Sequence, residues 1–173
     1  MEEVEEEYTN HKNKIFGLIR EIRSKKKVGL LLVFGSLPAL FKKGAHPLGK
    51  ISNDKKEMVK PVCSIYNKEA KGELLRIGCD GAVLIDEFGL IYEPSVYLNV
   101  NIEKINKNKI KQDYNARHIA ALVTSTLTGV TTFTLSENNR RIREFYNGKV
   151  VREHPKNILR DFKKRLKKFS RFR

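Results

Sequence analysis

The sequence predicts a single α/β domain, in which a mixed central β-sheet is flanked by helices and an amphipathic helix lies at each end of the chain. Two observations support this class. Apolar and β-branched runs of strand length alternate with segments whose apolar residues recur every three or four positions. The chain has 173 residues, which is enough for one domain with a real core and short for two. No apolar run approaches the roughly 18 residues that cross a membrane, so no membrane span is expected.

The same patterns suggest boundaries within the chain. We assign residues 1–26 to an N-terminal amphipathic helix, 27–153 to the central domain and 154–173 to a basic amphipathic C-terminal helix. Five glutamates open the first helix and Lys25–Lys27 close it, which is the charge order that the helix dipole favours. Its apolar stripe serves either docking and oligomerisation or plain core packing, and the sequence leaves both open.

Elements of the first half follow from local composition. Residues 28–34 are predicted to form a buried strand ended by Gly35-Ser36, and residues 37–43 a short helix. Residues 44–60 are rich in Gly, Pro and Lys, so they are predicted to be mostly loop. From Leu74 onward the pattern becomes typical of strands, which we place at 74–77, 81–86, 90–92 and 96–100.

The second half begins with a lysine-rich stretch, 101–113, that suits an exposed basic loop. Asn115 is a good cap for a helix over 116–127, and its small Ala120 and Ala121 allow close packing on a sheet. Strands are then predicted at 130–135, 141–146 and 149–151. The last two are joined by Asn147-Gly148, a typical two-residue hairpin turn.

The net charge of +15 indicates an anionic partner such as a nucleotide, a nucleic acid or an acidic surface. Residues 151–173 alone carry +8, which leaves +7 for the rest of the chain. Cys63 and Cys79 lack the spacing of a zinc site, so both are predicted to be buried, reduced thiols. The acidic start differs from a secretory signal, and we therefore expect a cytoplasmic protein.

Three short motifs have both a chemical and an ordinary interpretation. Gly44–Lys50 has the spacing of a phosphate-binding P-loop, but Ile51 replaces the metal-binding Ser or Thr and no strand directly precedes it, so we do not expect a Walker site. Asp80-Gly81 offers a carboxylate beside a close backbone approach, or it is a simple turn. Arg117-His118 opens a helix and could bind an anion, or it is a solvated helix start.

Taken in order, the motifs resemble those of the diadenylate cyclase (DAC) family over roughly residues 27–153, with 141–149 similar to archaeal members in particular. The matching stretches are Asp80-Gly81-Ala82, Tyr97-Leu98, Arg117–Ala121 and Ser136-Glu137. The resemblance implies a nucleotidyltransferase that condenses two ATP molecules into cyclic di-AMP, a second messenger, and pyrophosphate. It also implies a homo-oligomer in which the active sites of two subunits face each other.

The resemblance further implies the site residues. Asp80 would bind a divalent metal, Mn²⁺ or Mg²⁺, and help to activate a ribose 3′-hydroxyl, while Arg117 and His118 would contact the triphosphate. These three are the expected catalytic residues. The expected nucleotide-binding residues are Gly81, Ala82, Tyr97, Leu98, Arg117, His118, Ser136 and Glu137.

The sequence departs from the family pattern at two places. Asn115-Ala116 stands where Gly-Thr is usual, and Ile119 replaces a second arginine, so two polar phosphate contacts are lost. One alternative is therefore a catalytically dead relative that binds nucleotide as a regulatory subunit. Another is a basic RNA- or DNA-binding module, which is disfavoured because aromatic residues interleave with the basic runs only in the C-terminal tail.

Overall fold

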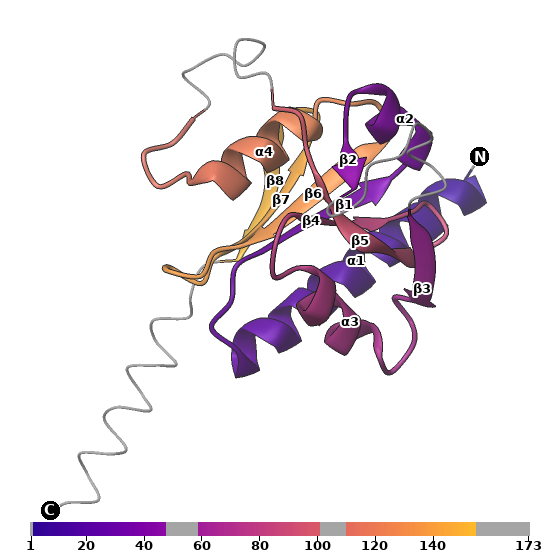
Figure 1. The fold of residues 1–173 in the computed structure, drawn as a ribbon, viewed down its shortest axis with the longest axis horizontal. Coiled ribbons are helices and arrows are strands. Elements are labelled where there is room, and N and C mark those ends of the chain that lie inside the picture. The colour runs from indigo at the N-terminus through magenta and orange to yellow at the C-terminus, as the bar shows by residue number, and fades with distance from the viewer. Residues whose placement is uncertain (1, 48–58, 101–109, 155–173) are drawn as a thin grey trace, which may run out of the picture.

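A computed structural model describes residues 2–47, 59–100 and 110–154 of the chain. Its strands form one eight-stranded mixed sheet with the order β2-β5-β4-β1-β6-β7-β8, and β3 also pairs with β5. Helices α1 and α3 lie on one side of this sheet and α4 on the other (Figure 1). The predicted class, a mixed sheet flanked by helices, is confirmed. In chain order the elements are α1 (Glu2–Lys25), β1 (Leu30–Gly35), α2 (Leu37–Lys42), β2 (His46–Pro47), β3 (Lys60–Ser64), α3 (Ala70–Ile77), β4 (Ala82–Ile85), β5 (Leu90–Tyr97), α4 (Ala116–Thr124), β6 (Val130–Leu135), β7 (Ile142–Tyr146) and β8 (Lys149–His154).

Strand β1 is at the centre of the sheet. It pairs in parallel with β4 and antiparallel with β6, and every residue of β1 and β6 is buried. A strand with helices on both of its faces is buried on both, which favours apolar residues and agrees with the largely apolar run 28–34. The prediction of a buried strand here, and of a short helix after it, is confirmed.

Helix α1 is part of the core. Ile15, Ile19 and Ile22 are each at most 1% exposed and pack with β1, β6 and α3. Of the two roles left open for this helix, the structure shows core packing.

Two predictions for the first half of the chain were wrong. Residues 74–77 form the end of α3 and not a strand, because Ala70, Leu74 and Ile77 are buried at spacings of four and three, as on one face of a helix. The two strands predicted at 90–92 and 96–100 are a single strand, β5, that ends at Tyr97. Strand β3, which pairs on the outer edge of β5, was not predicted.

Predictions for the second half were closer. Strand β6 has the predicted bounds, and α4 begins as predicted but ends at Thr124. Asn147 and Gly148 both have positive φ, 50° and 63°, as the predicted hairpin turn requires. Residues 101–109, residues 48–50 of the P-loop-like motif and all but the first residue of the predicted C-terminal helix (154–173) lie outside the described residues.

Helix α4 is fixed to the sheet by directional contacts as well as by apolar packing. Thr132 donates a hydrogen bond from its hydroxyl to the carbonyl of Ala121 at 2.9 Å. At the end of the helix, the backbone N–H of Gly148 lies 3.3 Å from both the hydroxyl and the carbonyl oxygen of Ser125. No helix in the described part of the chain has the length and hydropathy of a membrane span.

Candidate functional site

The strand register brings three of the predicted motifs to one end of the sheet. Leu30 at the start of β1 pairs with Leu135 at the end of β6, so Ser136 and Glu137 follow beside Gly29. On the other side of β1, the parallel strand β4 starts at the same end. Because Ala82 pairs with Val96, Tyr97 and Leu98 run beside the turn that contains Asp80 and Gly81.

A cleft with a volume of about 240 Å³ opens at this end of the sheet. Arg117 reaches it from the first turn of α4, and Glu137 enters from the segment after β6. Cys79, the neighbour of Asp80 in sequence, lines the wall that follows α3. The full lining is Lys27, Val28, Gly29, Leu30, Leu75, Gly78, Cys79, Arg117 and Glu137.

Gly29 makes room for the guanidinium of Arg117. A Cβ atom at position 29 would lie 2.6 Å from Nη1 of Arg117 and 3.6 Å from the Cβ of Glu137, and the first distance is so short that the guanidinium would have to move. Sequence reasoning missed Gly29, Lys27 and Cys79 as cleft residues. The available signal was a glycine interrupting the apolar run Val28–Phe34, which marks a close approach in a strand.

The start of α4 is fixed by a reciprocal cap. The side-chain oxygen of Asn115 accepts from the backbone N–H of His118 at 3.2 Å, and Nδ1 of His118 accepts from the backbone N–H of Asn115 at 3.3 Å. This capping box satisfies two otherwise unpaired donors. The predicted cap at Asn115 is confirmed. Because Arg117 lies between Asn115 and His118, the cap also fixes the backbone that carries Arg117.

The structure separates the side chains of Arg117 and His118. Arg117 lines the cleft, whereas His118 is 1% exposed and is not among the lining residues. Burial, reinforced by the positive charge of Arg143, lowers the pKa of His118 to about 4, so its ring is neutral at pH 7. Among the described residues, Nε2 of His118 has no hydrogen-bond partner.

The remaining predicted residues differ in their relation to the cleft: Glu137 lines it, whereas Asp80, Gly81, Ala82, Tyr97, Leu98 and Ser136 are not among its lining residues. Asp80 and Glu137 are exposed, and Gly81 adopts a positive φ of 79° in the turn before β4. Tyr97 is 61% exposed, while Leu98 packs against the apolar cluster on the α4 side. Ala82 and Ser136 are almost completely buried, at 1% and 5% exposed, so neither contributes appreciably to the surface.

The two cysteines differ from the prediction. Cys79 is exposed and Cys63 is partly buried, because Cys79 lies in the turn that ends α3, where its thiol donates to the carbonyl of Leu75 at 3.0 Å. Both are free thiols, as expected. Within the described ranges, no group of three or more His, Cys, Asp or Glu side chains is arranged to hold a metal ion.

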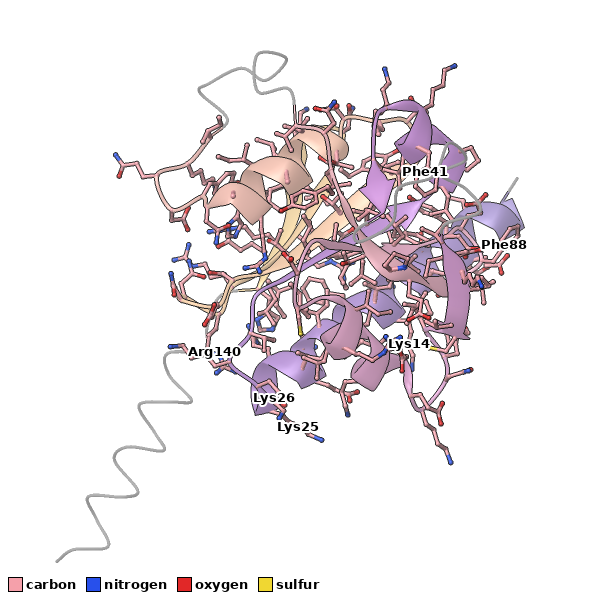
Figure 2. All side chains as sticks on the ribbon, in the orientation of Figure 1. Lys14, Lys25, Lys26, Phe41, Phe88 and Arg140 are labelled. Atoms are coloured by element: carbon pink, nitrogen blue, oxygen red, sulfur yellow. The ribbon has the colours of Figure 1, made fainter. Side chains whose placement is uncertain are left out.

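Basic side chains border this end of the molecule. Figure 2 shows Lys25, Lys26 and Arg140 on the same side of the molecule, and Arg140 donates to the carbonyl of Lys26 at 3.3 Å. Lys27, the next residue, lines the cleft. Positive charge gathered beside a concave surface raises the local concentration of anions.

Comparison with known proteins identifies the family and agrees with the fold. The family model "DAC: DisA bacterial checkpoint controller nucleotide-binding" matches residues 20–150. The fold is similar to that of a double cysteine mutant of DacA from Staphylococcus aureus, with a TM-score of 0.57 and 19% sequence identity over 92% of this chain and 93% of that one. A hypothetical membrane spanning protein from Bacillus cereus is also similar, with a TM-score of 0.51 and 17% identity over 80% of this chain and 61% of that one. At these identities the likeness concerns the fold. The sequence has no match among the curated proteins.

Proposed function

The chain belongs to the DAC family, and from that premise we propose that it is a diadenylate cyclase, which joins two ATP molecules into cyclic di-AMP with release of two pyrophosphates. One observation supports this proposal above the others. Arg117 and Glu137 come from distant parts of the chain and line one cleft together with Cys79, which directly precedes the Asp80-Gly81 turn.

Phosphate binding is assigned to the cationic side of the cleft. Arg117 presents a planar guanidinium that can form paired hydrogen bonds with phosphate oxygens, and Lys27 adds a second positive charge. His118 stays among the proposed site residues as the group that fixes the start of α4. Because it is neutral and buried, its contribution to phosphate binding does not come from charge.

The metal is assigned to the carboxylates. Mg²⁺ is usually held by one or two carboxylates together with substrate phosphates, so Asp80 and Glu137 suffice without a complete protein cage. A bound Mn²⁺ or Mg²⁺ would lower the pKa of the ribose 3′-hydroxyl and offset the charge that grows on the α-phosphate. Asp80 then orients the hydroxyl, and Arg117 holds the phosphate that it attacks.

The rest of the nucleotide is assigned to the open surface beside β5. The cleft is smaller than the roughly 300–1,000 Å³ of pockets that enclose whole small molecules, so it takes only part of ATP. Tyr97, Leu98 and Gly81 provide the remaining contacts, while the buried Ala82 and Ser136 support the surface from beneath. A surface that leaves Tyr97 61% exposed is open to a second copy of the same face.

Two copies are required by the chemistry. Each 3′-hydroxyl loses its proton to solvent as its oxygen forms a bond to the α-phosphorus of the other ATP, and the bond from that phosphorus to the departing pyrophosphate breaks. One chain offers one such site, so we propose that two subunits meet face to face and hold both reacting pairs in line. Such placement removes most of the entropic cost of bringing the two nucleotides together.

The direct test is incubation of the purified protein with ATP and Mn²⁺, followed by mass detection of the product. Cyclic di-AMP should accumulate, and Arg117→Ala should weaken ATP binding by at least about tenfold because charge-assisted bonds to phosphate are lost. Lys14→Ala is the control. Lys14 belongs to α1 and lies over the ring of Tyr66, away from the cleft. An equal loss of ATP affinity in both variants would contradict the role of Arg117. The absence of product from the wild type would contradict the proposed activity.

A second measurement separates binding from turnover. ATP should slow the alkylation of Cys79, which lines the cleft, and leave the alkylation of Cys63 unchanged. Cys63 reacts slowly in any case because burial raises the pKa of its thiol. Protection of Cys79 without product would identify an inactive nucleotide-binding relative. Stabilisation by a short oligonucleotide, without protection by ATP, would favour a nucleic-acid-binding module.

A further inference from the structure

Arg143 lies beneath α4 and is 0% exposed, which is unusual for an arginine. It projects from β7 towards the segment that leads into α4. Its Nη2 forms an ion pair with Asp113 of that segment, and its Nε lies 3.5 Å from Glu153 on the neighbouring strand β8. The guanidinium carbon is 5.1 Å from the centre of the Tyr114 ring, so one buried cation contacts both the segment before α4 and strand β8.

The contacts continue from Arg143 to the start of α4. The ring of Tyr114 stacks on that of His118, with centroids 5.3 Å apart and planes inclined by 16°. The ring of Phe145, on β7, packs edge-on against that of Tyr114, with the ring centroids 6.0 Å apart. His118 is in turn bonded to Asn115 by the capping box. The residue between Asn115 and His118 that reaches the cleft is Arg117.

We propose that Arg143 is a positioning residue for the nucleotide site, which acts through Tyr114 and His118 to hold the first turn of α4 so that Arg117 points into the cleft. The inference rests on the proposed function, because it assigns a purpose to the orientation of Arg117. The contacts that carry it are independent of that function.

The geometry explains why an arginine occupies this position. Burying an ion pair costs desolvation that its attraction seldom exceeds, so apolar side chains of the same volume would stabilise the core equally well. A guanidinium, however, can pair with Asp113 through Nη2 and place Nε 3.5 Å from Glu153 while its central carbon lies over the ring of Tyr114. A lysine ammonium has neither the fork nor the flat face.

Arg141 provides a matched control. It contacts the same two carboxylates, Asp113 at 3.5 Å and Glu153 at 3.1 Å, but its side chain is 43% exposed and it has no contact with the ring of Tyr114 among those found in the described residues. Arg141→Met therefore removes one positive charge from the same pair of acids and leaves the stack intact.

The test compares Arg143→Lys, Arg143→Met and Arg141→Met in the full chain, with ATP affinity measured by calorimetry and the His118 ring titrated by NMR. Both Arg143 variants should weaken ATP binding by roughly tenfold, because the first turn of α4 loses its anchor. In Arg143→Met the pKa of His118 should rise by about one unit, since a nearby positive charge is lost and Asp113 and Glu153 remain. Arg141→Met should change neither quantity appreciably.

Each outcome decides a different point. Arg143 variants with lowered melting temperatures but wild-type ATP affinity would make Arg143 purely structural and overturn the proposal. An unchanged His118 titration in Arg143→Met would disprove the link between the two residues. Should Arg143→Met fail to fold, Arg143→Lys decides through ATP affinity. Failure of the wild type to bind ATP would overturn the proposed function and the positioning role together, while a shifted His118 titration would still establish the contact.

Discussion

The two faces of the sheet are built differently. On the α1 and α3 face, Ile15, Ile19 and Leu74 are completely buried in one cluster, and α1 also makes hydrogen bonds through Tyr8 and Arg23. On the opposite face, α4 has an apolar cluster of its own and is also fixed at three points: by the Arg143 stack at its start, by Thr132 in its middle and by Gly148 at its end.

This difference suits the positions of the two faces relative to the cleft. Apolar packing is not directional, so it stabilises a helix without fixing its position precisely. Hydrogen bonds and stacked rings have preferred geometries, and they can hold a functional side chain within a fraction of an ångström. Among the helices in the described part of the chain, only α4 contributes a charged side chain to the cleft. We therefore expect the α1 face to determine stability and the α4 face to determine function.

The largest effect should come from the α1 face. Ile19→Ala removes a completely buried side chain and should lower the free energy of unfolding by about 3 kcal/mol, through lost burial and the cavity left behind. Chemical denaturation measures this loss. The folded variant should bind ATP with wild-type affinity, and a similar loss of affinity and stability would mean that the two faces are not separable.

The opposite result is expected for Asp80→Asn. Asp80 is exposed, so its replacement should leave the melting temperature unchanged. Turnover of ATP should fall by at least about a hundredfold, because a metal ligand is lost where charge develops. Near-normal synthesis of cyclic di-AMP by this variant would show that the metal site is misassigned.

The α4 face should also make stability depend on pH. The folded-state pKa of His118, about 4, is below its ordinary value of 6.5, so between these values the unfolded chain binds more protons and stability falls as the pH falls. From pH 7 to pH 5 the loss attributable to His118 should be about 2 kcal/mol. Denaturation at several pH values measures it.

His118→Gln isolates this contribution, because glutamine can complete the capping box but does not titrate. A control is needed because burial raises the pKa of Glu144, which opposes the His118 effect as the pH falls. Glu144 titrates in both proteins, so it cancels in the comparison. Identical pH dependence in wild type and His118→Gln would contradict a neutral, buried His118.

The smallest effect should follow Gly29→Ala. The added methyl would approach Nη1 of Arg117, and a flexible arginine end can move aside, so stability should hardly change. ATP affinity should decrease by about threefold because the displaced guanidinium meets phosphate less well. Calorimetry measures it, and Gly72→Ala is the control, since a Cβ at Gly72 meets nothing within 4 Å. An equal change in both variants would remove Gly29 from the site.

Much of the fold was predictable because local pattern and burial agree there. The β-branched run 130–135 became β6 with unchanged bounds, and Asn115 capped its helix. The failures have physical causes. Leu74–Ile77 is too short for periodicity alone to distinguish a helix from a strand, and β3 has an irregular register and mixed burial, so it lacks the alternation that identifies a strand.

The sequence identified the candidate residues of the site, but it did not predict how their side chains are arranged in space. Order along the chain identified Asp80, Arg117 and Glu137 as candidates, but the inward turn of His118 depends on Tyr114 and Arg143, which lie on different elements. A buried arginine cannot be recognised from sequence, because arginine is ordinarily exposed. Long-range pairing, which the sequence does not reveal, brings Arg143 beneath α4.

The central claim, that two ATP molecules react across a contact between two subunits, is tested most directly by mixing. Asp80→Asn subunits are titrated into wild type at constant total protein, subunit exchange is confirmed, and cyclic di-AMP is quantified. If paired faces make the product, only wild-type pairs are active, and an equal mixture should retain about one quarter of the wild-type activity. Retention of one half, with activity proportional to the wild-type fraction throughout, would mean that each chain works alone and would contradict the account.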